Sequence, residues 1–273
     1  MLKLIKMDFY RLFSSKTIKI GALMACLVSI GYTLLSLGII ALVKFAVNND
    51  PSMVEGWGFI IPQAEWLGGV NLSEVIFGGT GVLALFIGCM MTASFIGSEQ
   101  SCGYTKNFAG QLTDKGYMAF SKFIVTSVGQ TIILAIYAIV VGAAAKLMIG
   151  KYITGFDIKN LLLALSLRLI LHIAVNAIIV FVCTLTKSHA VAMIVGCIFG
   201  LSITEAAYIS ASMLLNAVKI NIDIINYMPD GINSQLNLYT AGELTQKAII
   251  VSVAFIIAFL AANYYVVRNR DVR

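Results

Sequence analysis

Long apolar runs without a charged residue constrain this chain more than any other feature of its sequence. Residues 75–98 and 123–145 contain no Asp, Glu, Lys or Arg. Each run exceeds the about 20 residues with which an α-helix crosses a bilayer. Four further stretches are nearly as apolar, so the sequence predicts six membrane spans at residues 20–44, 75–98, 123–147, 161–186, 188–208 and 247–267.

Composition agrees with a protein that lies mostly inside a bilayer. The chain is 59% hydrophobic and 12% charged, and its mean hydropathy is +0.92, whereas soluble domains contain about 25% charged residues. In lipid each segment must satisfy its own backbone hydrogen bonds, and these runs are too long and too uniformly apolar for barrel strands. The sequence therefore predicts an all-α integral membrane protein with a single transmembrane domain over residues 1–273.

Lys and Arg residues lie mainly on one side of the predicted spans. Most of the 19 bases precede the first span, lie in residues 99–122 or follow the last span, whereas residues 45–74 contain four acids and no base. Loops rich in Lys and Arg stay in the cytoplasm, so we expect both termini and the loop at 99–122 to be cytoplasmic. The net charge of +6 then reflects topology and contact with lipid headgroups, and no nucleic acid partner is expected.

Several classes of site have no signature in the sequence. Four of the five cysteines fall inside predicted spans and Cys102 falls in the loop, which argues against an extracellular disulfide framework. His172 and His189 lack metal-binding spacing, and there is no nucleophile elbow or phosphate loop. We therefore expect no catalytic residue, metal or cofactor on this chain, and any energy source other than an ion gradient must come from another chain.

The two ends of the predicted domain carry additional elements. Within residues 1–19, apolar residues recur at three- and four-residue spacing with bases beside them, which predicts an amphipathic helix on the inner lipid surface. A basic tail that only sets the topology is the alternative. Residues 209–246 are too long for a tight turn, and a proline turn at 228–231 predicts two short outer or re-entrant helices there.

The polar segment 99–122 is the best candidate for contact with a soluble partner. It combines acids, bases and a helix-compatible pattern in which Phe108, Leu112 and Tyr117 share one side. A solvated loop without a partner is the alternative. Glu99, at the membrane border, is expected either to pair with a base such as Lys106 or simply to be solvated.

The order of these features resembles a known transporter family. The opening residues 4–17 resemble an elbow helix, Glu99 followed by Gly103 and Thr105 resembles the start of a coupling loop, Lys122 resembles the base entering span three, and residues 227–231 resemble a broken re-entrant pair. Together they resemble the permease subunit of a bacterial ABC transporter of the six-span type-two exporter class.

This resemblance implies a location, partners and a contact site. The chain would lie in the bacterial plasma membrane with two cytoplasmic ATPase subunits, which bind ATP and Mg²⁺, and with a second permease, either identical or a sibling. The residues expected to contact the ATPase are Glu99, Gly103, Thr105, Lys106, Phe108, Leu112, Lys115 and Tyr117.

Polar residues inside the spans form a second candidate site. Arg168, His172 and Asn176 recur every four residues in span four and so share one helix face. Ionisable residues inside a span are costly and are functional candidates for that reason. Glu205 is the one acid in span five, and we hypothesise an ion pair between Arg168 and Glu205. A packing clasp, or an arginine that reaches the outer headgroups, is the alternative.

Three classes of function are compatible with these features. The first is an ABC exporter permease that moves an amphipathic or hydrophobic cargo, such as a peptide, a lipid-linked molecule or a drug. The second is an ion-coupled secondary carrier, for which His172 is the main candidate residue. The third, a membrane enzyme, lacks a recognisable set of nucleophile, base and metal ligands.

Overall fold

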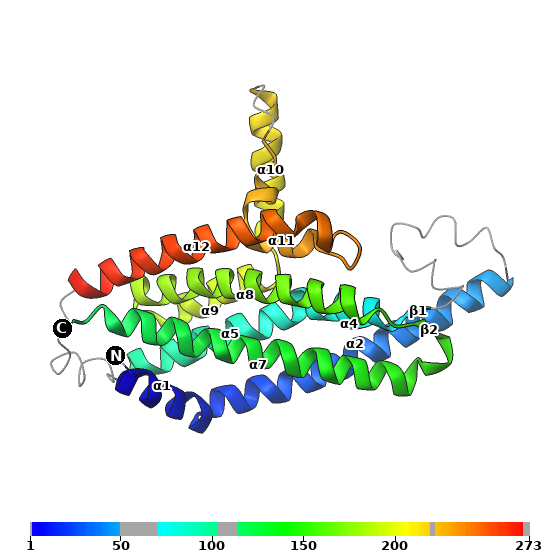
Figure 1. Cartoon of the computed structure of the whole chain (residues 1–273), viewed down its shortest axis with the longest axis horizontal. Coiled ribbons are helices and arrows are strands. Elements are labelled where there is room, and N and C mark those ends of the chain that lie inside the picture. The colour runs from blue at the N-terminus through cyan, green and yellow to red at the C-terminus, as the bar shows by residue number, and fades with distance from the viewer. Residues whose placement is uncertain (1, 50–69, 103–113, 219–221, 270–273) are drawn as a thin grey trace.

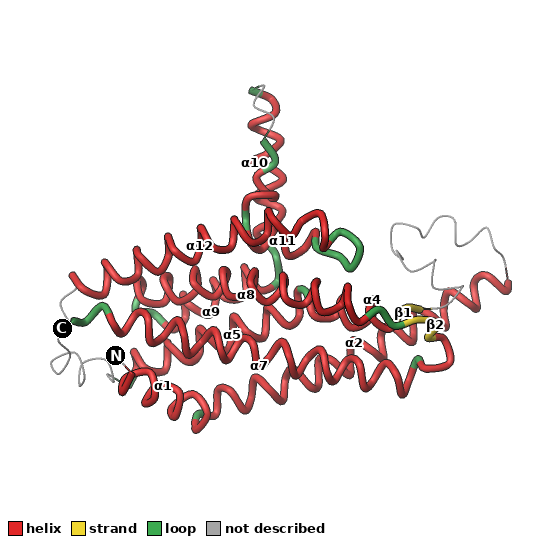
Figure 2. The backbone as a smooth tube through the Cα atoms, in the orientation of Figure 1, coloured by secondary structure: helices red, strands yellow, loops and turns green. Residues whose placement is uncertain are grey.

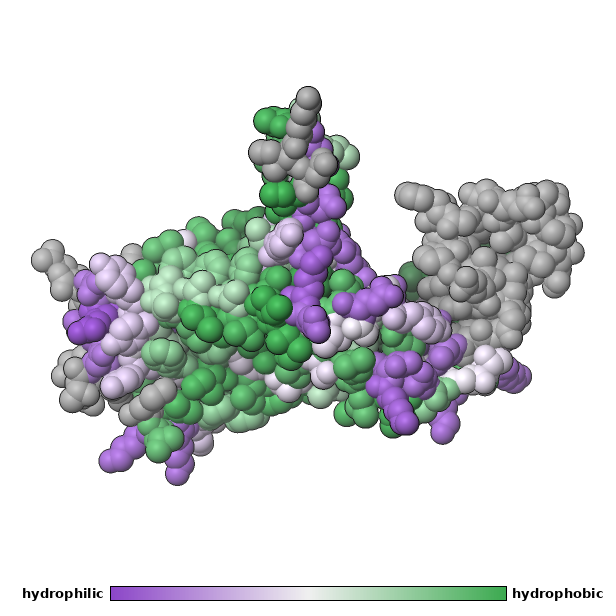
Figure 3. Space-filling model, turned by 45° about the horizontal axis from the view of Figure 1, so that its top comes forward, coloured by the Kyte–Doolittle hydropathy of each residue, from purple (hydrophilic) through white to green (hydrophobic). Residues whose placement is uncertain are grey.

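The chain folds into an elongated bundle of helices that run along a common axis (Figure 1). The computed structural model describes residues 2–49, 70–102, 114–218 and 222–269. Both ends of the described chain, with helix α1, lie at one end of the bundle, and the two short strands lie near the other. Figure 3 shows a hydrophobic surface along the middle of the bundle and hydrophilic residues toward its ends. This surface confirms the transmembrane character that the sequence predicts.

In the described part of the chain, five helical segments are long and apolar enough to cross a membrane. Their bounds are wider than predicted, because each helix continues past its apolar run at one or both ends. They are α2 (Lys16–Asn49), α4 (Leu72–Thr80) together with α5 (Val82–Ser101), α7 (Tyr117–Met148), α8 (Ile158–Thr186) and α12 (Ala241–Asn269).

Two predicted spans are broken helices rather than continuous ones. Span two is interrupted at Gly81, whose φ of −68° and ψ of −96° lie outside the helical region. The predicted span 188–208 consists of α9 (His189–Gly200) and α10 (Thr204–Ala217), which meet at an angle of 67°. Figure 1 shows α10 leaving the bundle sideways instead of continuing along it.

The N-terminal helix α1 (Leu2–Ser14) buries one acid together with apolar residues. Its buried residues are Leu4, Asp8 and Leu12, whereas Leu2 is 83% exposed. The helix packs against α7 with an acid on its buried side. A charge partner inside the bundle therefore sets its orientation, in addition to the apolar spacing.

Two short strands lie near the end of the bundle opposite α1 (Figure 2). β1 (Val70–Asn71) pairs in parallel with β2 (Ile153–Gly155), which follows the 3₁₀ turn η2 (Gly150–Tyr152). Side chains cap the helices that follow: Asn71 accepts from the backbone of Ser73, and Asp157 accepts from that of Asn160. Elements this short have no readable periodicity, and the sequence did not predict them.

The predicted turn at 228–231 is the start of a helix. The 3₁₀ turn η3 (Ile224–Tyr227) leads to an extended Met228, and α11 (Pro229–Gln235) begins at the proline. Proline suits the first helical position because it lacks an N–H that would otherwise have no partner there.

The core of the bundle consists of two buried apolar clusters. One includes Tyr137 and Leu171, and the other includes Phe95 and Ile179.

Candidate functional site

A buried cluster of charges lies at the end of the bundle that contains the N-terminus. We call Asp8, Arg11, Glu99, Ser121 and Lys122 the inner cluster. Glu99, near the end of α5, is 2% exposed, and its carboxylate forms ion pairs with Arg11 of α1 and with Lys122 of α7. One acid therefore joins three helices that are distant in the sequence.

A second acid completes the charge balance of the inner cluster. Asp8 accepts a 2.6 Å hydrogen bond from the Ser121 hydroxyl, and Arg11 Nη1 lies 3.9 Å from Asp8 Oδ1. The Arg11 guanidinium also lies over the Phe95 ring, 4.3 Å from its centroid. The negative charges of two carboxylates thus balance the positive charges of two bases. Such pairing is expected for buried charges, because an unpaired charge is costly in a low-dielectric interior.

The sequence predicted the importance of Glu99 but not its partners. Simple solvation of Glu99 is wrong, since its side chain is buried between Arg11 and Lys122. Lys106, the base suggested for it, lies outside the described residues, as do Gly103, Thr105, Phe108 and Leu112. Arg11 was missed because it belongs to a helix that the sequence placed on the lipid surface.

The other end of the 99–122 segment is attached to the last helix. Asp114 accepts hydrogen bonds from the Tyr264 hydroxyl at 2.6 Å and from the Gly116 backbone N–H at 2.8 Å. These two bonds, the first one foremost, lower the pKa of Asp114. Lys115, the next residue, is half-buried. Tyr117 is 37% exposed and is the first residue of α7, not part of a separate coupling helix.

Arg168 donates hydrogen bonds to groups beside the helix break in span two. Its Nη1 donates to the Phe77 carbonyl and, at 2.9 Å, to the Thr80 hydroxyl, while Nη2 donates to the Leu236 carbonyl at 3.2 Å. The Thr80 hydroxyl also donates to the Phe77 carbonyl, at 2.8 Å. The guanidinium can contact several groups beside the break at Gly81 because it presents several donors in one plane. Arg168 therefore holds α4 and the end of α11 against α8.

The hypothesised ion pair between Arg168 and Glu205 is not formed. The salt bridges among the described residues all belong to the inner cluster, and Glu205 lies in the first turn of α10. Arg168 is also 3% exposed, so its guanidinium does not reach the bundle surface. The packing clasp weighed as the alternative describes its contacts better.

The remaining predicted residues of span four continue inward from Arg168 as a buried polar seam. Asn176 donates to the hydroxyls of Thr126 and Ser127, both at 3.0 Å, and accepts from Thr92 at 2.7 Å. These bonds tie α8 to α5 and α7. His172 is 1% exposed, and neither of its ring nitrogens has a hydrogen-bond partner among the described residues.

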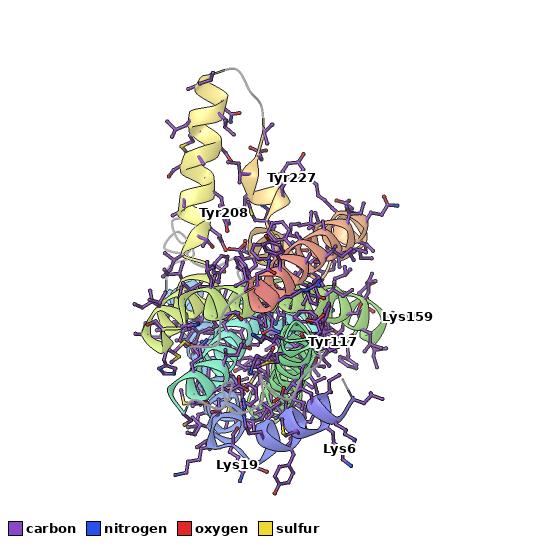
Figure 4. The ribbon with its side chains drawn as sticks, turned by 90° about the vertical axis from the view of Figure 1, so that its left-hand side faces the viewer. Lys6, Lys19, Tyr117, Lys159, Tyr208 and Tyr227 are labelled. Atoms are coloured by element: carbon purple, nitrogen blue, oxygen red, sulfur yellow. The ribbon has the colours of Figure 1, made fainter. Side chains whose placement is uncertain are left out.

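A third polar contact fixes the base of α10. Asp230, at the start of α11, is fully buried and accepts hydrogen bonds from Thr204 and from the Tyr208 hydroxyl at 3.1 Å. Figure 4 shows α10, with Tyr208, projecting from one side of the bundle, whereas Lys6 and Lys19 lie on the other. The sequence treated Asp230 as part of a turn and missed this contact.

Comparisons of this chain with protein-family models and with curated proteins find no match. Among the described residues, no group of three His, Cys, Asp or Glu side chains is placed to hold a metal ion. The site therefore consists of a charge-balanced joint at one end of a membrane bundle and a polar seam within it.

Proposed function

We propose that this chain is the permease subunit of an ATP-driven ABC exporter in a bacterial plasma membrane. A separate cytoplasmic ATPase, present in two copies, would bind ATP and Mg²⁺, and a second permease would complete the complex. The observation that carries this proposal is the attachment of the 99–122 segment: Glu99 at its start is ion-paired to α1 and α7, and Asp114 near its end is bonded to α12.

These attachments support a mechanical role for the segment. An ATPase that binds it and closes would displace α5 and α7 directly, because the segment connects them. The inner cluster would carry the same displacement to α1, and Asp114 would carry it to α12 through Tyr264. Buried ion pairs suit this role, since breaking one costs about 3–5 kcal/mol and the helices therefore move together.

The layout that goes with this function has six spans and cytoplasmic termini. In it, α9 begins span five, and α10 to α11 form the re-entrant part that precedes α12. The concentration of bases at the N-terminal end of the bundle supports this orientation. The cargo would be amphipathic or hydrophobic, because the bundle presents a largely apolar surface from which such a molecule can enter.

A second candidate is an ion-coupled secondary carrier. It is favoured by His172, an ionisable residue that is buried beside the polar seam. Ionisable groups inside a membrane protein are frequent in proton and ion pathways. Under this function the chain would work without an ATPase.

Affinity purification of the tagged chain from its native membrane tests the proposal. We expect a soluble nucleotide-binding subunit to copurify in mild detergent and to hydrolyse ATP, whereas the isolated chain has no ATPase activity. Replacing Phe108, Leu112 and Tyr117 with Ser should remove that subunit while the permease still elutes as a folded, monodisperse protein.

A matched variant separates loss of the contact from a general effect of apolar surface substitutions. Phe156 and Ile158 are 53% and 54% exposed at the opposite end of the bundle. Replacing them with Ser should leave the copurified ATPase unchanged. Absence of any nucleotide-binding subunit from the wild-type preparation in several detergents would reject the ABC assignment and make His172→Ala in a proton-coupled uptake assay the next experiment.

A further inference from the structure

The α10 arm leaves the bundle at half the depth of the membrane. We use this name for α10 (Thr204–Ala217). Helix α9 has 12 residues, about 18 Å of the about 30 Å of hydrocarbon. It ends at Gly200, where an added Cβ would lie 2.6 Å from the Phe86 Cα. Phe86 is the middle residue of the span Leu72–Gln100, so the arm begins near the bilayer centre.

The contacts at its base hold the arm in this direction. Asp230 accepts from Thr204 and Tyr208, and the Ser212 hydroxyl accepts from the Ile224 backbone N–H at 2.9 Å. One side of the arm is therefore attached to α11 and to the segment that returns from its tip. Figures 1 and 4 show the rest of the arm standing clear of the bundle.

The uncovered side of the arm does not suit lipid along its whole length. Ile209 is 46% exposed and Met213 is 66% exposed, as expected for a surface that packs against apolar atoms. Asn216, however, is also exposed near the far end of the arm, and Asp223 is exposed just before Ile224, which bonds to Ser212. An Asp near the bilayer centre costs about 2.5–3.5 kcal/mol on insertion scales, and polar residues there are normally covered by protein or face a water-filled cavity.

The order of residues on the arm matches that of a second, antiparallel arm. Glu205, Ile209, Met213 and Asn216 are spaced so that they share one helix face. When two such helices lie antiparallel, Glu205 of each faces Asn216 of the other, and Ile209 packs beside Met213. Glu205 has no ion pair among the described residues, and the Asn216 amide of a second copy can donate to its carboxylate.

We propose that the α10 arm binds the α10 arm of a second copy of this chain, antiparallel across a two-fold axis perpendicular to the membrane. Such an interface is closed, since the same surface serves both subunits. The two bundles would then lie on either side of the paired arms, with an inter-subunit space between them. This inference rests on the proposed function, which includes a second permease, and it identifies that second permease as an identical chain.

Cysteine cross-linking in native membranes tests this contact. In a variant whose five native cysteines are replaced with Ser or Ala, Ile209→Cys together with Met213→Cys should form a covalent dimer when a membrane-permeant oxidant is added. Leu214→Cys is the matched control, because Leu214 is 71% exposed on the same arm but is rotated about 140° from Ile209. The control should give several-fold less dimer.

A polar exchange tests the pairing of Glu205 with Asn216. Asn216→Glu brings two carboxylates together and should reduce the copurification of two differently tagged copies. Adding Glu205→Asn to the same chain restores one acid opposite one amide and should recover it. Since both variants place a Glu at position 216, recovery cannot come from altered insertion of that residue.

The amount of copurified ATPase, measured in the same samples, separates this inference from the proposed function. Dimer formation without an ATPase would reject the ABC assignment and support the arm contact. An ATPase with no cross-link from Ile209 and Met213, or with equal cross-linking from Leu214, would overturn the arm contact. Cross-linking only to a different membrane protein, or failure of the Glu205→Asn exchange to recover copurification, would also overturn it.

Discussion

At the scale of single residues, buried charges are stabilised here in two different ways. Glu99 has two bases as partners, and Asp8 balances the remaining positive charge. Arg168 instead donates to the carbonyls of Phe77 and Leu236 and to a hydroxyl, and no acid in the described part of the chain is paired with it. Removing Glu99 would leave an excess of positive charge in the inner cluster, with Asp8 as its remaining acid, whereas removing Arg168 would take a donor from buried carbonyl groups.

We predict that Arg168→Gln strongly lowers the thermal stability of the detergent-solubilised protein. Hydrogen bonds to a charged group contribute about 1.5–3 kcal/mol each, and Gln is too short to reach both α4 and α11. Arg168→Lys should also lose stability, because one ammonium cannot reproduce the planar fork that contacts Phe77 and Leu236. The melting temperature, followed by size-exclusion chromatography after heating, measures the effect.

The control for this prediction is Glu205→Gln, which removes a charge but keeps hydrogen-bonding capacity. It should leave the melting temperature unchanged, since Arg168 contacts Phe77, Thr80 and Leu236 instead. A loss as large as that of Arg168→Gln, together with recovery in a variant that exchanges the two charges, would favour the ion pair with Glu205 after all.

The sequence predicted the candidate residues of the site better than their contacts. The four-residue spacing of Arg168, His172 and Asn176 was sufficient to place them on one helix face, because that periodicity belongs to the helix itself. The partner of Arg168 depends on a break in another helix, at Gly81. No spacing within span four contains that information.

At the scale of secondary structure, small residues allow α9 to approach α5 closely. Gly196 faces the backbone of Cys89, and Gly200 faces that of Phe86. At Gly97 the contact is with the His189 side chain. Close packing between membrane helices depends on such residues because their backbones can then come together. The start of the α10 arm is fixed by this contact.

We predict that Gly200→Ala destabilises the protein by about 1–3 kcal/mol, the usual cost of overpacking. An alanine Cβ at this position would lie 2.6 Å from the Phe86 Cα, so the two helices must separate. Gly196→Ala, with its closest atom at 3.4 Å, should cost less, and Gly31→Ala, with no atom within 4 Å, should cost nothing. Thermal melts of the three variants in one detergent provide the comparison, and equal stability of all three would contradict this packing.

The existence of the long helices was more predictable than their interruptions. Apolar runs alone identified α2, α7, α8 and α12, because lipid requires long, uncharged helices. The bend between α9 and α10 lies inside such a run, at Leu201, Ser202 and Ile203. The residues immediately before and after the bend are mostly apolar, so hydropathy did not separate one crossing helix from two helices at an angle.

At the scale of the whole molecule, the two ends of the bundle differ in the charge and contacts of their residues. The end with α1 contains the inner cluster, both ends of the described chain and the attachments of the 99–122 segment. The opposite end contains β1 and β2 and the side-chain caps of α4 and α8. This asymmetry, together with the excess of Lys and Arg near the first end, favours a cytoplasmic location for the inner cluster.

Cysteine labelling tests this orientation with a residue that the chain already has. Cys102 is exposed just after α5, at the end that contains the inner cluster, whereas Lys151 is exposed in η2 near the strands at the opposite end. A membrane-impermeant maleimide added to intact cells should therefore label Lys151→Cys in a Cys102→Ser background but should not label Cys102. Permeabilising the membrane should make Cys102 reactive. Labelling of Cys102 in intact cells would place the inner cluster outside, where a cytoplasmic ATPase could not contact the segment that Glu99 and Asp114 hold.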